Sequence, residues 1–514
     1  MTEHRTGPIT EPATGPSSGQ PATGPITEPS SGQPSSGLPS SGQPSSGQPS
    51  TDPALVGPAT IVEPPRSRGG WLRHHAIDTR PMAIPPFRRQ VLGQGTAFIG
   101  AMLTQVAVPV QVYALSGSSL QVGLVGLVGL LPLVAFGLWG GAAADAIDRR
   151  SLYLVSSVGG WLVTLGLLAQ TALGLNSVPL ILLLVAVQAG FFAMSSSARG
   201  AIVPRLVPPE LVPAANTLTF TISNVGLVIG PLIAGVLVTR RHGFEYAYAV
   251  DAILFAVALY AALRLPPMPP QPGSEAPGLR SVFDGLAFIA ARPVLLMSFG
   301  VDIVAMVFAM PRALFPQVAA ERWHGQVGPL YAAIAIGAVL AGLSGGWIGR
   351  IRRQGVALTL AIVGWGICVT VSGLAHALWL AVMMLALAGA ADLISAVYRQ
   401  SMLQTYAPDQ MRGRMQGVFV VVVAGGPRLG DLRAGATASV AGVTASWVGG
   451  GLVCAFGVLL AALLVRPFWR YDASKRYDAG KRSDGGKRSD GGKRSDGGKR
   501  SDTDKVDTRQ PPVG

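Results

Sequence analysis

The sequence predicts an all-α membrane protein in which twelve transmembrane helices form two halves of six. Three observations support this prediction: long apolar runs, arginines gathered on one set of connections, and sequence matches between the two halves. Of the 514 residues, 49% are hydrophobic and only 13% are charged, whereas a soluble protein carries about 25% charged residues. We therefore expect a chain that crosses a lipid bilayer many times.

Twelve apolar runs follow a long polar N-terminal segment, and each approaches the roughly 20 residues that a helix needs to cross a bilayer. Because hydrocarbon cannot satisfy an open strand edge, and the runs are too long for barrel strands, we expect helices. The expected helices lie near residues 91–113, 120–142, 152–174, 177–197, 214–238, 246–264, 293–313, 327–348, 356–374, 377–397, 416–438 and 446–466.

The arginines predict the orientation, because arginine favours cytoplasmic loops. If the N-terminus is inside, only Arg240, Arg241 and Arg322 lie on the opposite side. We therefore expect both termini in the cytoplasm and the protein in the inner or plasma membrane. The connections expected to be cytoplasmic hold Arg149, Arg150, Arg199, Arg205, Arg264, Arg280, Arg292, Arg350, Arg352, Arg353, Arg399, Arg412 and Arg414.

Composition divides the chain further. The N-terminal tail is rich in Pro, Ser and Gly, and the C-terminal tail repeats the basic unit KRSDGG. Neither can bury enough apolar surface to fold, so we expect both to be disordered. Within the linker between the halves, Leu279–Ala291 has the pattern of an amphipathic helix lying on the membrane. The expected segments are the N-terminal tail (1–88), the N-terminal half (89–264), the cytoplasmic linker (265–291), the C-terminal half (292–468) and the C-terminal tail (469–514).

Matches at a constant offset of 200 residues predict that the halves arose by duplication. Secondary transporters are often built this way, with the binding site between the halves. The matched pairs are Arg199 with Arg399, Pro208 with Pro408, Gly226 with Gly426, Gly230 with Gly430, and Gly235 with Gly435.

A short charged loop joins the second and third runs. It reads Gly141-Ala-Ala-Ala-Asp145-Ala-Ile-Asp148-Arg149-Arg150. This pattern resembles the loop between helices 2 and 3 of the major facilitator superfamily. There the aspartate lies at the positive end of a neighbouring helix, which the helix dipole favours, and the arginines form ion pairs that hold one state of the transport cycle. The resemblance implies the same roles for Asp145, Arg149 and Arg150, although Ala146 and Asp148 replace the family's usual basic residue and glycine.

The fifth run contains Gly226, Gly230, Pro231 and Gly235 in a pattern similar to the helix-5 motif of exporters in this superfamily. Glycines four residues apart lie on one helix face and let another backbone approach, and a proline permits a bend. The resemblance favours export; the alternative is helix packing without a gating role. Four further stretches resemble the drug and siderophore exporter group, namely residues 93–127, 198–216, 301–316 and 421–436.

Charges within the runs are candidates for function, because a charge at a helix centre costs about 2.5–3.5 kcal/mol on insertion scales. We expect Asp302 to carry a proton or face the substrate, and Asp392 is a further candidate for coupling or substrate contact. Arg428 and Asp431 are three residues apart and can pair, as either a static ion pair or a switch. Asp251 is expected to pair structurally with Arg312. Neutral candidates for the cavity wall are Gln94, Gln105, Gln111 and Gln188.

Several classes are excluded or unsupported. Cys368 and Cys454 lie inside apolar runs and indicate neither a disulfide nor a metal site. No Walker motif is present, and few combinations of nucleophile, base and orienting group lie near one another, so we expect no enzyme, cofactor or metal. The net charge of +14 is concentrated in the tails and on one set of loops, which indicates membrane orientation rather than nucleic-acid binding.

Together these observations predict a monomeric secondary active exporter whose partners are the lipid bilayer, a small amphipathic molecule and protons. It would work by alternating access with proton exchange. A dedicated siderophore exporter is the nearest alternative. A non-transporting membrane sensor or scaffold that acts through the tails is the alternative of another class.

Overall fold

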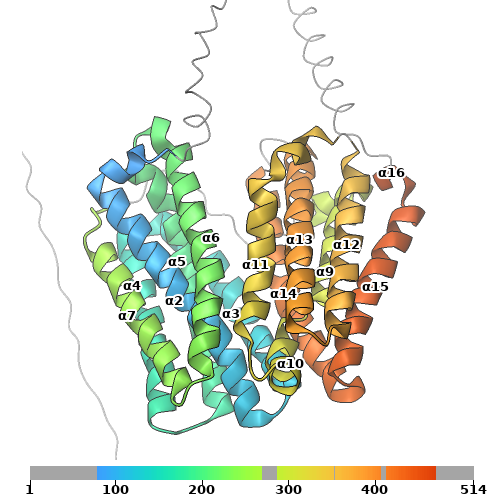
Figure 1. Cartoon of the computed structure of the whole chain (residues 1–514). Coiled ribbons are helices and arrows are strands. Elements are labelled where there is room, and N and C mark those ends of the chain that lie inside the picture. Colours follow the sequence, from blue (N-terminus) through green and yellow to red (C-terminus); the bar gives the residue numbers. More distant parts are fainter. Residues whose placement is uncertain (1–77, 269–285, 352, 407–411, 470–514) are drawn as a thin grey trace, which may run out of the picture. The chain divides into compact units, whose positions relative to one another are not determined.

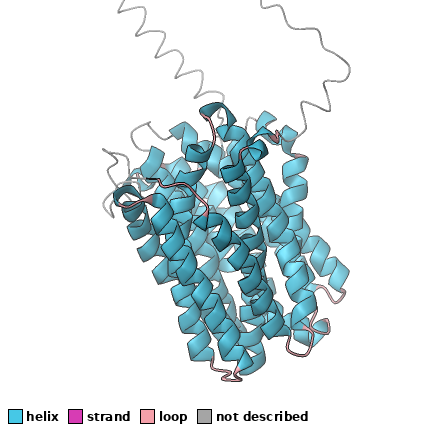
Figure 2. Cartoon of the chain, turned by 90° about the vertical axis from the view of Figure 1, so that its left-hand side faces the viewer, coloured by secondary structure: helices cyan, strands magenta, loops and turns pink. Residues whose placement is uncertain are grey.

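The computed structural model describes residues 78–268, 286–351, 353–406 and 412–469. These residues belong to one compact unit, Leu72–Gly514, and in them every regular element is helical (Figure 2). Both predicted tails, apart from their ends next to the helices, lie outside the described residues. So does most of the predicted linker helix, of which residues 286–290 are described and helical.

Six long helices make up the first half (Figure 1). Each corresponds to one of the first six apolar runs, and each extends beyond or ends close to the predicted limits. Polar or glycine-containing turns separate them; Gly117, with φ of 64°, ends the first by adopting a left-handed conformation that favours glycine. The helices are α2 (Pro85–Ser116), α3 (Ser119–Ala146), α4 (Arg149–Ala172), α5 (Val178–Leu206), α6 (Val212–Val238) and α7 (Gly243–Leu263), with short 3₁₀ turns η1 (Arg80–Ala83) and η2 (Pro209–Leu211).

The second half has the same order of long helices with two interruptions. The run predicted at 293–313 stops early because Met310 is extended before Pro311, as a residue preceding proline prefers. The run at 327–348 ends in a 3₁₀ turn. The elements are α9 (Pro293–Ala309), η3 (Arg312–Leu314), α10 (Phe315–Arg322), α11 (Gly328–Leu343), η4 (Gly345–Arg350), α12 (Gln354–Leu374), α13 (Leu378–Tyr406), α14 (Arg412–Ala441), α15 (Val443–Leu464) and α16 (Arg466–Trp469).

Ten helical segments in the described part are long and apolar enough to cross a membrane. Of the remaining two predicted spans, α11 is apolar but shorter, and α14 has 30 residues that include several charges. Large apolar side chains such as Leu131, Leu343 and Phe456 are exposed, as expected of surfaces that face lipid. The chain is therefore a multi-pass helical membrane protein, and the count of twelve spans stays a prediction.

The two halves meet mainly along two helix pairs, α3 with α14 and α6 with α11. Small residues bring these backbones close. Gly123 near the start of α3 lies against the backbone of Asp431 and Leu432, and Gly235 near the end of α6 lies against Gly328 at the start of α11. Both approaches are near the helix ends that lie away from the described chain ends (Figure 1). The halves therefore close against each other on the face opposite the chain ends.

Candidate functional site

A cavity of about 440 Å³ lies between the halves. Residues of α2, α3, α4, α5 and α7 line it from the first half, and residues of η3, α11 and α14 line it from the second. A mostly apolar cavity of this size with a few polar groups is typical of a small-molecule site. It lies where the duplication predicted a site.

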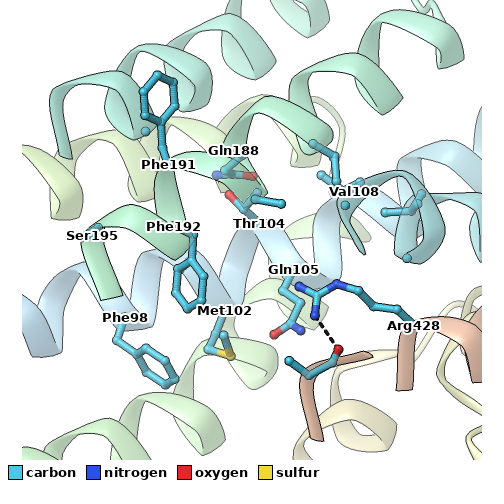
Figure 3. A pocket seen from close by; sticks show the side chains of 18 of the residues that line it. Phe98, Met102, Thr104, Gln105, Val108, Gln188, Phe191, Phe192, Ser195 and Arg428 are labelled. Atoms are coloured by element: carbon cyan, nitrogen blue, oxygen red, sulfur yellow. Dashed lines mark hydrogen bonds between the residues drawn. The ribbon is translucent and has the colours of Figure 1, made fainter. Parts of the chain in front are cut away.

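Aromatic and apolar side chains make much of its wall. Phe98 and Met102 come from α2, and Phe191 and Phe192 come from α5 (Figure 3). Phe255 on α7 adds another ring. Rings offer a large apolar surface with little conformational entropy to lose, so this wall suits a flat or aromatic part of a ligand.

Neutral polar groups interrupt the apolar wall. Gln105 and Gln188 line the cavity, together with Ser195 (Figure 3). Two of the four predicted glutamines are therefore in place. Gln94 is not among the lining residues. Gln111 is buried between helices, where it donates to Thr171 Oγ1 at 3.0 Å and accepts from the Tyr248 hydroxyl at 2.7 Å.

Arg428 and Asp431 both line the cavity, as does Arg312 from the connection after α9. The predicted direct ion pair between Arg428 and Asp431 is not among the ion pairs of the described residues. Instead, Arg428 Nη1 donates to the backbone carbonyl of Ala424 at 2.7 Å (Figure 3). Asp431 Oδ1 is buried without a hydrogen-bond partner. The two charges attract each other from the same wall, but each keeps its own local geometry.

Asp302 is placed differently from the expectation of a cavity-facing acid. It is not among the lining residues but pairs with Arg399 on α13, and the two side chains are 4% and 5% exposed. Asp392, two turns earlier on α13, approaches the same guanidinium, with its Oδ1 3.9 Å from Nη2. The prediction that Arg399 lies in a cytoplasmic connection is wrong, because α13 continues to Tyr406 and Arg399 is buried within this helix.

Asp251 does not pair with Arg312, so that prediction is also wrong. Its carboxylate accepts hydrogen bonds from Thr104 Oγ1 at 2.5 Å and Thr164 Oγ1 at 3.5 Å, inside the first half. Arg312 belongs to η3 in the second half and faces the cavity. No sequence signal predicts these two hydrogen bonds, because both threonines look like ordinary residues of apolar helices.

The glycines of the helix-5 motif lie at two different contacts of α6. A side chain at Gly226 would meet Phe98 and Ile99 of α2, and one at Gly230 would meet Met102 of the same helix. Gly235 faces Gly328 of the other half, whose own neighbour is the Pro231 carbonyl. The motif therefore joins α6 to its own half at two points and to the opposite half at a third.

The charged loop between α3 and α4 is tied to the segment that follows α7. Gly141 and Asp145 belong to the last turns of α3. Asp148 caps α4, accepting from the Ser151 N–H at 3.0 Å, and its other oxygen accepts from the Met268 N–H at 2.8 Å. The Arg149 N–H donates a hydrogen bond of 3.2 Å to the Met268 carbonyl.

The same loop reaches the end of α7 through Arg150, whose Nη2 donates to the Leu263 carbonyl at 2.8 Å. Partial burial raises the pKa of the Asp148 carboxyl, but the N–H groups of Ser151 and Met268 and the charge of Arg150 outweigh that effect, so its pKa lies below the ordinary value. Asp148, which replaces the family's glycine, thus ties the loop to the start of the linker.

Arg199 is the main cavity residue that the sequence analysis missed. It had been placed at the cytoplasmic end of the fourth run, but α5 continues to Leu206 and Arg199 lines the cavity. Its guanidinium lies over the Phe192 ring, 5.5 Å from the centroid. The seven-residue spacing, which is two helical turns, was the available signal.

No group of three or more His, Cys, Asp or Glu side chains suited to a metal ion occurs among residues with described positions. Cys368 is half-buried and Cys454 buried, and both are free thiols.

Comparisons with known proteins agree with this geometry. Residues 78–481 match the model of a major facilitator family described as "Transmembrane secretion effector". The chain is 31% identical over 390 residues to the enterobactin exporter EntS of Escherichia coli O1:K1 / APEC, covering 74% of this chain and 92% of that protein. EntS of Citrobacter koseri is 31% identical over 389 residues, with 74% and 91% covered.

Solved structures show the same fold at low identity. The nucleoside transporter NupG superposes with a TM-score of 0.62 at 14% identity, covering 76% of this chain and all (100%) of that one. A bacterial homologue of the human lysosomal transporter Spinster gives a TM-score of 0.58 at 18% identity, covering 76% and 97%.

Proposed function

Because the chain belongs to the transmembrane secretion effector family of the major facilitator superfamily, we propose that it is a secondary active exporter of the inner or plasma membrane. Members of this superfamily are transporters rather than enzymes. The exported molecule is small and amphipathic, and it crosses by alternating access in exchange for protons.

The observation that carries this proposal is the cavity between the duplicated halves. Its wall combines aromatic rings from α2 and α5 with charged groups from both halves. A site at the interface of two repeated bundles can be exposed to either side by rocking one bundle against the other. A soluble-enzyme or purely structural role would not require a cavity that both bundles line.

The closed end of the cavity supports an assignment of this conformation within the transport cycle. The halves touch on the face opposite the chain ends, through Gly123 with α14 and Gly235 with Gly328. With both termini in the cytoplasm, this arrangement is closed to the outside. Opening it requires that these backbone contacts separate while contacts form at the other end.

Proton exchange needs an acid that can gain and lose a proton during the cycle. Asp431 lines the cavity, and its Oδ1 has no hydrogen-bond partner. A proton on Asp431 would remove its attraction for Arg428, so protonation would change the charge of the cavity wall. The buried cluster of Asp302, Asp392 and Arg399 is the second place where an ion pair could break during the cycle.

A dedicated siderophore exporter is the second candidate. It is favoured by the similarity to enterobactin exporters, which extends over 92% of their length rather than over one motif. A membrane sensor or scaffold is the competing class, and measured flux separates it from both exporters.

The test is efflux from proteoliposomes with an imposed pH gradient, preceded by a screen for exported compounds in a strain that lacks other pumps. We expect proton-driven flux to fall at least about tenfold in Asp431→Asn, as expected when an acid–base group is removed. Asp78→Asn, at an exposed pair with Arg80 outside the spans, is the matched control. Full proton-driven flux in both Asp431→Asn and Asp302→Asn would refute the coupling. A folded chain that moves no compound would refute the exporter.

A further inference from the structure

The two halves carry an arginine at the same place in the repeat. Arg199 lies on α5 and Arg399 lies on α13, each the fourth long helix of its half, at the offset of 200 residues. A duplicated arginine inside a membrane helix is costly unless its charge is used. What surrounds each arginine therefore shows how the two halves have diverged.

In the second half the arginine is neutralised within the protein. Arg399 is buried and pairs with Asp302 of α9, while Asp392 lies 3.9 Å from its Nη2. Two carboxylates around one guanidinium leave no positive charge for a ligand.

In the first half the corresponding positions hold no acid. The residue 200 positions before Asp392 is Phe192, and α2, the first-half helix that corresponds to α9, contains no Asp or Glu. Phe192 lies under the Arg199 guanidinium at 5.5 Å, a cation–π distance. Among the described residues no ion pair joins Arg199 to a carboxylate, unlike Arg399.

Arg199 faces the cavity, and so do Met102, Phe192 and Tyr153. Phe192, which stands where the second half has Asp392, is therefore part of the cavity wall. The charge that the second half neutralises internally is presented to the cavity by the first half.

The other charged residues of the cavity wall are also mostly positive. Arg312 and Arg428 also line it, and Asp431 is the acid among its lining residues. Asp431 already has Arg312, Arg428 and Arg433 acting on it. The wall thus has a net positive charge, and an apolar surround strengthens such a field because it screens charge poorly.

We propose that the cavity binds an organic anion with an aromatic or apolar body, and that Arg199 is the residue that holds its negative charge. This inference rests on the proposed function and names its substrate class. Phe98, Phe191 and Phe255 would contact the apolar body, and a charge-assisted hydrogen bond from the guanidinium would select the anion. A cationic ligand would find no acid that is free of arginine neighbours.

The test uses the full-length chain in detergent micelles and two fluorescent probes that differ only in charge. Dansylglycine carries a carboxylate, and dansylglycinamide carries a neutral amide in its place. Titration gives the ratio of their dissociation constants. We expect the wild-type chain to bind dansylglycine about tenfold more tightly, which corresponds to about 1.4 kcal/mol, and Arg199→Gln to bind both alike.

Two further variants and one control distinguish the loss of the anion site from a folding defect. Arg199→Lys keeps the charge and should retain part of the preference. Phe192→Asp copies the arrangement of the second half and should abolish the preference while leaving Arg199 in place. Arg264→Gln is the matched control, because Arg264 lies over the Tyr260 ring at 5.4 Å but does not line the cavity.

A wild-type chain that does not discriminate between the probes would overturn the proposal, as would an unchanged ratio in Arg199→Gln and Phe192→Asp. Counterflow of the same probes in proteoliposomes tests transport separately. A binding preference without flux would support the anion site and refute the exporter. Flux with a ratio that does not depend on Arg199 would refute the anion site and leave the exporter standing.

Discussion

The buried cluster around Arg399 predicts an asymmetry between two single substitutions. Asp302 and Arg399 are 4% and 5% exposed, whereas Asp392 is 37% exposed and lies 3.9 Å from Nη2 of Arg399. Arg399→Gln leaves Asp302 buried with no cation, and removing one partner of a buried pair costs about 3–5 kcal/mol. Asp302→Asn leaves Arg399 with Asp392 beside it, so we expect a smaller loss of about 1–3 kcal/mol.

The assay is denaturant unfolding in detergent micelles, monitored by tryptophan fluorescence. The double variant Asp302→Asn with Arg399→Gln removes the unpaired buried acid, so it should be more stable than Arg399→Gln alone. That coupling is what a double-mutant cycle measures. Arg264→Gln at an exposed guanidinium is the control. The reasoning is refuted if Asp302→Asn costs as much as Arg399→Gln, or if the double variant shows no recovery.

Asp148→Ala should lower the free energy of unfolding by about 0.5–2 kcal/mol, the cost of removing a helix cap. Because the pKa of Asp148 is lowered in the folded state, the difference from wild type should be complete above about pH 4. It should disappear as the pH falls through that lowered pKa. Gly235→Ala would place a Cβ 2.5 Å from Gly328 Cα and should separate the halves there, which a longer distance between labels on the two halves would show. Gly300→Ala is the control, because its Cβ would have nothing within 4 Å and should not change that distance. Reporter fusions at both chain ends should report the cytoplasm, and a reporter active on the other face would contradict the predicted orientation.

The helices could be predicted because their signal is local. Each apolar run predicts a helix, because a segment in lipid must satisfy its own backbone hydrogen bonds. No knowledge of the neighbouring segments is needed. The break at Pro311 is also a local effect, since proline restricts Met310. The matches between the halves were visible for the same reason, because a constant offset depends only on the sequence.

The cavity residues could not be predicted in the same way, because a run of apolar residues does not say which face meets which helix. Asp302 and Asp431 look alike in sequence, but one pairs with a guanidinium on α13 and the other lines the cavity. Arg199 was assigned to a loop because the fourth run was ended too early. Arg312 was assigned to Asp251, although the partners of Asp251 are the hydroxyls of Thr104 and Thr164.

The two glycine trios show which part of the duplication was kept. In the first half, Gly226 and Gly230 face α2. In the second half, their counterparts Gly426 and Gly430 face Met306 and Met310, at and just beyond the end of α9. Each pair therefore packs against the first long helix of its own half, so the close packing within a half was preserved.

The third glycine of each trio crosses to the other half. Gly235 meets Gly328 at the start of α11, and Gly435 meets Ser119 at the start of α3. If each bundle moves as a packed unit, a closure built twice from the same contact opens at both places together. Alanine at Gly435 should therefore weaken the closed end about as much as alanine at Gly235. A large effect at only one of them would mean that one bundle bends while the other stays in place.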